Sequence, residues 1–188
     1  MKRAISVCAV ILLCITSDGY PTTYPDSFRW VVLPVPYVQQ QTEVWCWAAS
    51  AEMVFRYHGR RISQCETLSA WFFPANCCAQ IRSCATTVPD TRYIQKTLFA
   101  LGGIRSTWRI GALDFAEIMS EINARRPIIV GYRGSFSGHV VVLHGYDNRR
   151  NVYIHDPIYG SGWRVPYGSA FFYQGHLVWA ETLYKISP

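Results

Sequence analysis

The hydrophobic pattern of this chain changes once, near Pro127, and the change limits the folds open to it. Ahead of Pro127, three segments combine helix-forming residues with stop signals such as Gly59 and Gly103: residues 46–58, 91–101 and about 112–124. Beyond Pro127, β-branched and aromatic runs alternate with turn residues: residues 127–133, 139–146, 151–155 and 176–186. An earlier strand is expected at residues 28–33. Helices followed by an antiparallel sheet predict an α+β fold.

Length and composition fit one globular domain. Of the 188 residues, 50% are hydrophobic and 16% are charged, which provides enough apolar surface for a core. We expect this domain to span residues 20–188 and to be monomeric. The net charge of +6 comes from scattered basic residues, so no nucleic-acid partner is predicted, whereas attraction to a cell surface or an acidic substrate stays open.

The N-terminal residues 1–19 are typical of a secretory signal peptide. Two basic residues precede an apolar run over residues 4–15, and small residues stand before Tyr20, where we expect cleavage. A lipid anchor at Cys14 is the alternative, but bulky Leu13 argues against it. The apolar run is too short to span a bilayer comfortably, and no later stretch is long enough to span one. A secreted or periplasmic protein without stable membrane insertion is predicted.

Four cysteines, Cys65, Cys77, Cys78 and Cys84, crowd into an insert at residues 65–84, and outside the signal peptide only Cys46 is left over. Adjacent cysteines bridge each other only with strain, so Cys77 and Cys78 are expected to pair with Cys65 and Cys84 in one of two connectivities. Zinc binding is the alternative, but the paired C-x-x-C arms of a zinc site are missing and export favours disulfides. No metal site is predicted.

Cys46 stands between Trp45 and Trp47 at the predicted start of the first helix. A thiolate at that position is stabilised by the positive end of the helix dipole, which makes the thiol a better nucleophile. A core cysteine that fills space between the two tryptophans is the other interpretation, since free cysteine is often buried. The tryptophans themselves are typical of packing groups. A catalytic base elsewhere in the chain would favour the nucleophile over the core cysteine.

His139 is the best candidate for that base because it begins a predicted strand beside a glycine-rich turn. We expect this strand and the next to form a hairpin around residues 147–150, with Tyr146 facing Asn151. Side chains two apart along a strand share a face, so His139 and Asp156 become diagonal neighbours. A carboxylate there orients the imidazole and stabilises its charged form.

The remaining histidines fit structural positions better. By the same parity, His144 and His155 fall on the opposite face from Asp156, as core or surface histidines rather than a metal pair. His58 ends the first predicted helix, where a capping role suits it. His176 begins a late strand without an obvious acidic partner.

Gln40 lies six residues before Cys46, where a side-chain amide could stabilise an oxyanion together with the Cys46 backbone N–H. The neighbouring Gln39 and Gln41 make this spacing less specific. A glutamine in a polar loop is usually only solvated.

Taken together, these features resemble the papain-like cysteine peptidases, and most closely their compact bacterial branch, which includes secreted effector peptidases and relatives of bacteriocin leader peptidases. The likeness is carried by residues 40–59, with a glutamine six residues before the helix-opening cysteine. Residues 127–157 carry the rest, with a Gly-His-Val strand and a later Asp-Pro. Papain has asparagine where Asp156 stands, whereas aspartate occurs in the compact branch.

This resemblance implies a helical half that carries the nucleophile, packed against an antiparallel β-sheet half. Cys46 would be the nucleophile, His139 the general base, Asp156 the orienting residue and Gln40 the oxyanion donor. The implied function is an exported cysteine endopeptidase that acts on peptides or proteins through a thioester, and no cofactor is implied. One alternative uses the same triad for acyl transfer, as in transglutaminases, or for cleavage of cell-wall peptides. A non-catalytic binding module is the other.

Overall fold

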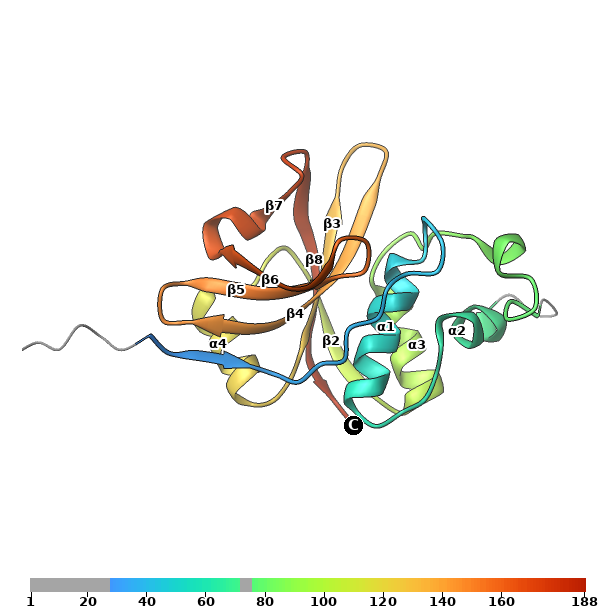
Figure 1. Ribbon diagram of the computed structural model, residues 1–188, viewed down its shortest axis with the longest axis horizontal. Coiled ribbons are helices and arrows are strands. Elements are labelled where there is room, and N and C mark those ends of the chain that lie inside the picture. Colours follow the sequence, from blue (N-terminus) through green and yellow to red (C-terminus); the bar gives the residue numbers. More distant parts are fainter. Residues whose placement is uncertain (1–27, 72–75) are drawn as a thin grey trace, which may run out of the picture.

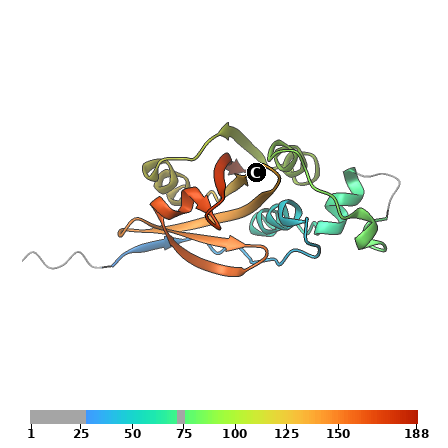
Figure 2. The same ribbon diagram turned by 90° about the horizontal axis from the view of Figure 1, so that it is seen from above.

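The computed structural model describes residues 28–71 and 76–188, and it divides the molecule into a helical part and a sheet part. In Figure 1, α1, α2 and α3 gather on one side, and β4, β5 and β6 extend on the other. Figure 2 shows α4 at the far end of the molecule from these three helices. The predicted signal peptide, residues 1–19, lies outside the described residues. The α+β arrangement expected from the order of patterns is confirmed.

The described residues form four α-helices: α1 (Cys46–Tyr57), α2 (Gln64–Trp71), α3 (Arg92–Gly102) and α4 (Phe115–Asn123). Three match the predicted segments, and α2, inside the cysteine-rich insert, was not predicted. Gly103 ends α3 in the left-handed conformation with φ +67°, as its sequence position indicated. Asp114 and Glu117 form a capping box at the start of α4. No helix in the described ranges is long and apolar enough to cross a membrane.

The sheet is antiparallel, with strand order β2-β8-β3-β4-β5-β6, while β1 pairs with β4 and β7 with β8. The bounds are β1 (Trp30–Val32), β2 (Arg105–Ile110), β3 (Ile128–Arg133), β4 (Gly138–Asp147), β5 (Asn151–Asp156), β6 (Gly160–Pro166), β7 (Phe172–Tyr173) and β8 (Leu177–Ser187). Strands β2 and β6 were not predicted. Both lie at edges of the sheet, where side chains stay largely exposed and the apolar pattern is weak.

The hairpin between β4 and β5 differs from its expected register near the turn. Tyr146 faces Val152 rather than Asn151, so the predicted pairing is wrong there by one residue. An irregularity between Leu143 and Gly145 absorbs the extra residue, and Val142 then faces His155, which is the expected register. His139 and Asp156 therefore stay on one face, as the parity argument requires.

Helix α1 packs against β4, and this contact positions the site. Ser50, one turn beyond Cys46, donates a hydrogen bond at 3.3 Å to the carbonyl of Val140, the neighbour of His139. The core on the helical side includes fully buried Trp47 and Phe55. The start of α1 is thus held beside the start of β4.

Two disulfides staple the cysteine-rich insert. Cys65 is bonded to Cys78, and Cys77 to Cys84, which is one of the two connectivities that the sequence left open. Among the cysteines in the described ranges, Cys46 is the free one.

Candidate active site

Cys46 is the first residue of α1, and its side chain is partly exposed. The two flanking tryptophans are buried and anchor the helix start to the end of the insert and to the residues just after it. Trp45 Nε1 donates to the Cys84 carbonyl at 3.2 Å, and Trp47 Nε1 to the Thr86 carbonyl at 3.1 Å. The packing interpretation therefore holds for the tryptophans, while the cysteine between them faces a cleft.

His139 and Asp156 are hydrogen-bonded to each other, with His139 Nε2 and Asp156 Oδ1 3.0 Å apart. Both side chains are buried. His139 is the second residue of β4, and Asp156 is the last residue of β5. Asp156 Oδ1 also accepts from the backbone N–H groups of Ile158 at 2.8 Å and Tyr159 at 3.3 Å. The carboxylate is fixed by the turn that follows it, and it fixes the imidazole in turn.

The His139 imidazole also interacts with the Cys46 thiol. Burial on its own lowers the pKa of His139, but hydrogen bonds to Asp156 and Cys46 outweigh it and raise that pKa to about 9. Burial raises the pKa of Asp156, whereas the His139 hydrogen bond and charge lower it, and the net direction is down. Because Nε2 is bonded to Asp156, Nδ1 is the nitrogen left for the thiol. The site favours a charged imidazolium paired with a carboxylate.

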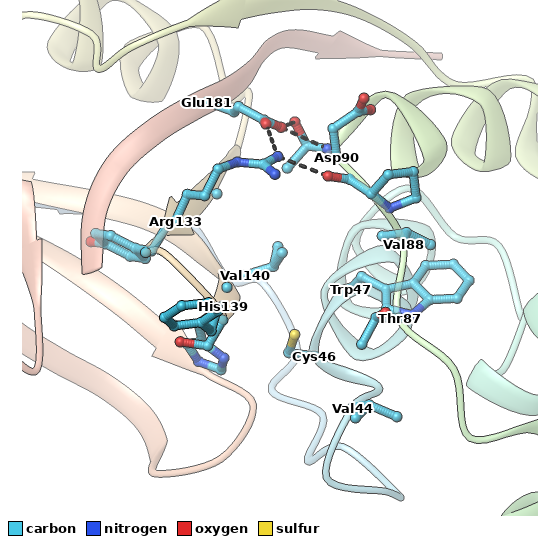
Figure 3. Close-up of a pocket in the computed structure, with 18 of the residues that line it drawn as sticks. Val44, Cys46, Trp47, Thr87, Val88, Asp90, Arg133, His139, Val140 and Glu181 are labelled. Atoms are coloured by element: carbon cyan, nitrogen blue, oxygen red, sulfur yellow. Dashed lines mark hydrogen bonds and ion pairs between the residues drawn. The ribbon is translucent and has the colours of Figure 1, made fainter. Parts of the chain in front are cut away.

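Figure 3 shows the Cys46 sulfur and the His139 ring across the same cleft. The cavity has a volume of about 360 Å³ and lies between the start of α1 and the β3–β4 hairpin. On its far wall, Arg133 pairs with Glu181 and donates to the Pro89 carbonyl at 2.8 Å. Glu181 in turn accepts from the Thr91 backbone N–H at 2.7 Å. These bonds join the sheet to the segment that leads into α3.

Gln40 lies in the segment ahead of α1, and its side-chain amide is hydrogen-bonded within that segment. Gln40 Nε2 donates to the Thr42 carbonyl at 2.7 Å, and its Oε1 is buried without a hydrogen-bond partner among the described residues. The Gln40 backbone N–H donates to the Pro157 carbonyl at 3.1 Å, which ties this segment beside Asp156. The oxyanion role of Gln40 stays a prediction.

Tyr173 contacts the site and was missed in the sequence. Its ring centroid lies 4.5 Å from that of His139. The Tyr173 hydroxyl is buried and makes no well-formed hydrogen bond within the described chain. Burial and the nearby Asp156 charge both raise the pKa of this hydroxyl. Tyr173 belongs to the two-residue strand β7, which is too short to give a pattern.

His144 and His155 are structural, and their rings stack with centroids 3.8 Å apart. His144 Nδ1 lies 3.1 Å from the Leu33 carbonyl and His155 Nε2 lies 2.8 Å from the Val35 carbonyl, so both hold the N-terminal segment against the sheet. Burial, and then the charge of His155, lower the pKa of His144 to about 4.

The two remaining histidines also lie apart from Cys46. His58 caps the end of α1, and burial followed by the Arg60 charge lowers its pKa. His176 is exposed, with Nδ1 2.9 Å from the Gln174 carbonyl.

Several known proteins are similar to this chain. Residues 32–185 match the model of the Peptidase_C39 like family. A C39-like peptidase from Bacillus anthracis has a similar structure over 83% of this chain and 97% of its own, with 16% identity and a TM-score of 0.57. UfSP from C. elegans matches over 89% of this chain and 36% of its own, with 14% identity and a TM-score of 0.51.

A double glycine motif protease from an AMS/PCAT transporter, solved in complex with the leader peptide, covers 81% of this chain and 91% of its own. Its identity is 19% and its TM-score 0.48. No curated protein sequence matches the chain. At these identities the solved structures support the fold alone.

Proposed function

Because the chain belongs to the Peptidase_C39 like family, it is a papain-like cysteine peptidase, and we propose that Cys46, His139 and Asp156 are its catalytic triad. The observation that carries this proposal is the chain of contacts from Asp156 through His139 to Cys46. The carboxylate lies 3.0 Å from His139 Nε2, and the Cys46 thiol is close enough to that imidazole to help raise its pKa. A nucleophile, a base and an orienting residue in this order are the parts that thiol catalysis needs.

At the start of the reaction, His139 is an imidazolium that holds the proton given up by Cys46, and the sulfur attacks the carbonyl carbon of a peptide bond. The carbonyl oxygen becomes an oxyanion, which the Cys46 backbone N–H at the start of α1 stabilises. The C–N bond then breaks, and His139 gives its proton to the leaving amine. A thioester between Cys46 and the acyl half of the peptide remains.

In the second half, water attacks the thioester and His139 takes the proton of that water. The C–S bond breaks, a carboxylic acid leaves, and Cys46 is restored. Asp156 stabilises the imidazolium in both halves, since its charge helps to raise the pKa of His139 to about 9. Gln40 supplies a second oxyanion donor through the amide N–H that is not bonded to the Thr42 carbonyl.

The substrate is a peptide, and we propose cleavage within the chain of a peptide or protein, because the cleft is open and Cys46 lies on its wall. Export is proposed from the signal-like residues 1–19 and from the two disulfides, which persist in oxidising compartments. N-terminal sequencing of the protein recovered outside the cytoplasm tests export. A chain that begins at Tyr20 supports it, and an uncleaved intracellular chain contradicts it.

Hydrolysis of labelled casein by the purified protein tests the function. Cys46→Ser and His139→Ala are expected to lose turnover, whereas His176→Ala, which changes an exposed imidazole outside the site, should keep it. Full activity of the His139→Ala variant would refute the assignment.

A further inference from the structure

A second cavity, of about 400 Å³, opens between β5, β6 and the segment around β7, and it plays no part in the mechanism above. Its lining is mostly apolar and includes Val141, Ile154, Trp163, Val165, Ala170 and Phe172. Asp156 is the one charged residue that lines it within the described ranges, and that carboxylate is already bonded to His139. A concave apolar site of this size fits a compact apolar group.

The second cavity adjoins the catalytic residues. Tyr132 lines both this cavity and the cleft at Cys46, and it faces His139 across the β3–β4 pair. Tyr173 forms another part of its wall, and the same ring lies against His139. Three residues that line the second cavity, Tyr132, Tyr173 and Asp156, are therefore direct neighbours of the imidazole.

The mouth of the cavity carries exposed aromatic surface. Trp163 is 52% exposed and Phe172 58% exposed. Tyr159 is held there by a 2.6 Å hydrogen bond from Gln174 Nε2 to its hydroxyl. Aromatic side chains scattered singly over a surface need no explanation, but a cluster around an apolar hollow is typical of a binding site.

The direction of the reaction indicates which part of the substrate lies nearest to the second cavity. His139 gives its proton to the leaving amine, so the part of the substrate after the scissile bond lies against His139. That part is the nearest to Tyr173 and the second cavity. We infer that this cavity binds a large apolar side chain of the substrate on the leaving side of the scissile bond. This inference rests on the proposed function.

Partitioning of an acyl-enzyme between water and added amines tests the inference directly. The N-benzyloxycarbonylglycine 4-nitrophenyl ester acylates Cys46 and releases 4-nitrophenol. The part of the site on the leaving side of the scissile bond is then empty. An amino-acid amide then attacks the thioester: its nitrogen bonds to the carbonyl carbon, its proton goes to His139, and Cys46 departs. L-Phenylalaninamide is expected to form its product at least about tenfold faster than L-alaninamide, which is the smallest discrimination usual for an apolar pocket.

Two variants change the cavity in opposite ways. Val165→Phe fills it from β6, and Phe172→Ala removes part of its mouth. Each is expected to reduce the preference for phenylalaninamide several-fold, with a melting curve to show that the variant is folded. Phe99→Ala is the matched control, because Phe99 on α3 is also 58% exposed and lies outside both cavities. It should keep the preference.

The outcomes separate the two proposals. Equal use of both amides by the wild-type acyl-enzyme would overturn the inference and leave the peptidase intact. A preference that survives in both Val165→Phe and Phe172→Ala would also overturn it. Failure of the ester to acylate Cys46 would overturn the proposed function and the inference together.

Discussion

The imidazole of His139 is subject to two opposing effects. Burial would lower its pKa, but the Asp156 carboxylate and the Cys46 thiol raise that pKa to about 9. The imidazole therefore keeps its proton across the neutral range. A protonated imidazole is the form that can protonate a leaving amine.

Replacing Asp156 tests the source of this shift. Asp156→Asn keeps an oxygen that accepts from His139 Nε2 but removes the charge, so the pKa of His139 falls. The loss of kcat/KM at high pH, expected near pH 9 in the wild type, should move to lower pH. Asp156→Ala should reduce kcat/KM further, by about 100-fold or more, because the imidazole is no longer oriented.

The pH dependence of kcat/KM measures both effects. Glu43→Gln is the control, since Glu43 is an exposed carboxylate near the start of α1 and makes no contact in the triad. An unchanged high-pH limb in Asp156→Asn would show that this carboxylate does not set the pKa of His139.

Gln40→Ala tests the oxyanion role, which the observed contact with Thr42 leaves as a prediction. If the Gln40 amide donates to the oxyanion, the variant should lose about 100 to 1000-fold in kcat with little change in KM. Gln39→Ala and Gln41→Ala are matched controls with exposed side chains. Losses below threefold for Gln40→Ala, like those of its neighbours, would exclude the role.

At the scale of single residues, strand parity was enough to predict that His139 and Asp156 share a face. The contact of Tyr173 with His139 could not be predicted, because it depends on how β7 returns over the sheet. The hydrogen bond from Gln40 to Thr42 could not be predicted from the sequence either, since a loop of three glutamines has no periodicity.

At the scale of elements, the β4–β5 hairpin shows why the parity argument held although part of its register was wrong. Tyr146 is displaced by one residue, which alone would turn His139 to the other face. The irregularity before Gly145 restores the register. Gly145 packs tightly there, because a Cβ atom at this position would come within 2.8 Å of the Val31 carbonyl.

His144 links the stability of the sheet to pH. Its pKa is about 4 in the folded protein and about 6.5 in an unfolded chain. Between these values the unfolded chain binds the proton and the folded protein does not, so the free energy of unfolding falls as pH is lowered from 6.5 toward 4. Urea unfolding at pH 7 and pH 4.5 should show this loss.

His144→Asn should make that loss smaller, because the amide replaces the donor to the Leu33 carbonyl but does not titrate. His176→Asn, at an exposed imidazole, should lose as much stability as the wild type. An identical acid-induced loss in His144→Asn and the wild type would rule out His144 as its source.

The two disulfides have different expected effects on activity and on stability. The Cys65–Cys78 bridge spans 13 residues and the Cys77–Cys84 bridge spans 7. Replacing both cysteines of a bridge with serine should therefore cost about 3 kcal/mol for the longer loop and about 2.5 kcal/mol for the shorter one. Loss of the Cys77–Cys84 bridge should nevertheless reduce activity more than loss of the Cys65–Cys78 bridge, because Trp45, next to Cys46, donates to the Cys84 carbonyl.

Thermal unfolding and casein hydrolysis of the two double variants compare these rankings. A larger activity loss in Cys65→Ser/Cys78→Ser than in Cys77→Ser/Cys84→Ser would show that the bond from Trp45 to Cys84 does not support the nucleophile.

At the scale of the whole molecule, the order of helices and strands was sufficient to predict the fold class and the meeting of a helix start with a strand start. The sequence was not sufficient for α2, whose residues are held by the stapled insert. It was also not sufficient for β2 and β6, the exposed edges of the sheet. These segments depend on contacts distant in sequence, so their local patterns are weak.

The central claim is that the fold makes Cys46 a nucleophile through His139. Mass spectrometry after a rapid acid quench measures this most directly, with the protein mixed with the N-benzyloxycarbonylglycine 4-nitrophenyl ester and then digested. The account predicts one acyl group, on the peptide that contains Cys46, forming in the wild type and at least about 100-fold more slowly in His139→Ala. Acylation at another residue, or equally fast acylation of Cys46 in His139→Ala, would contradict it.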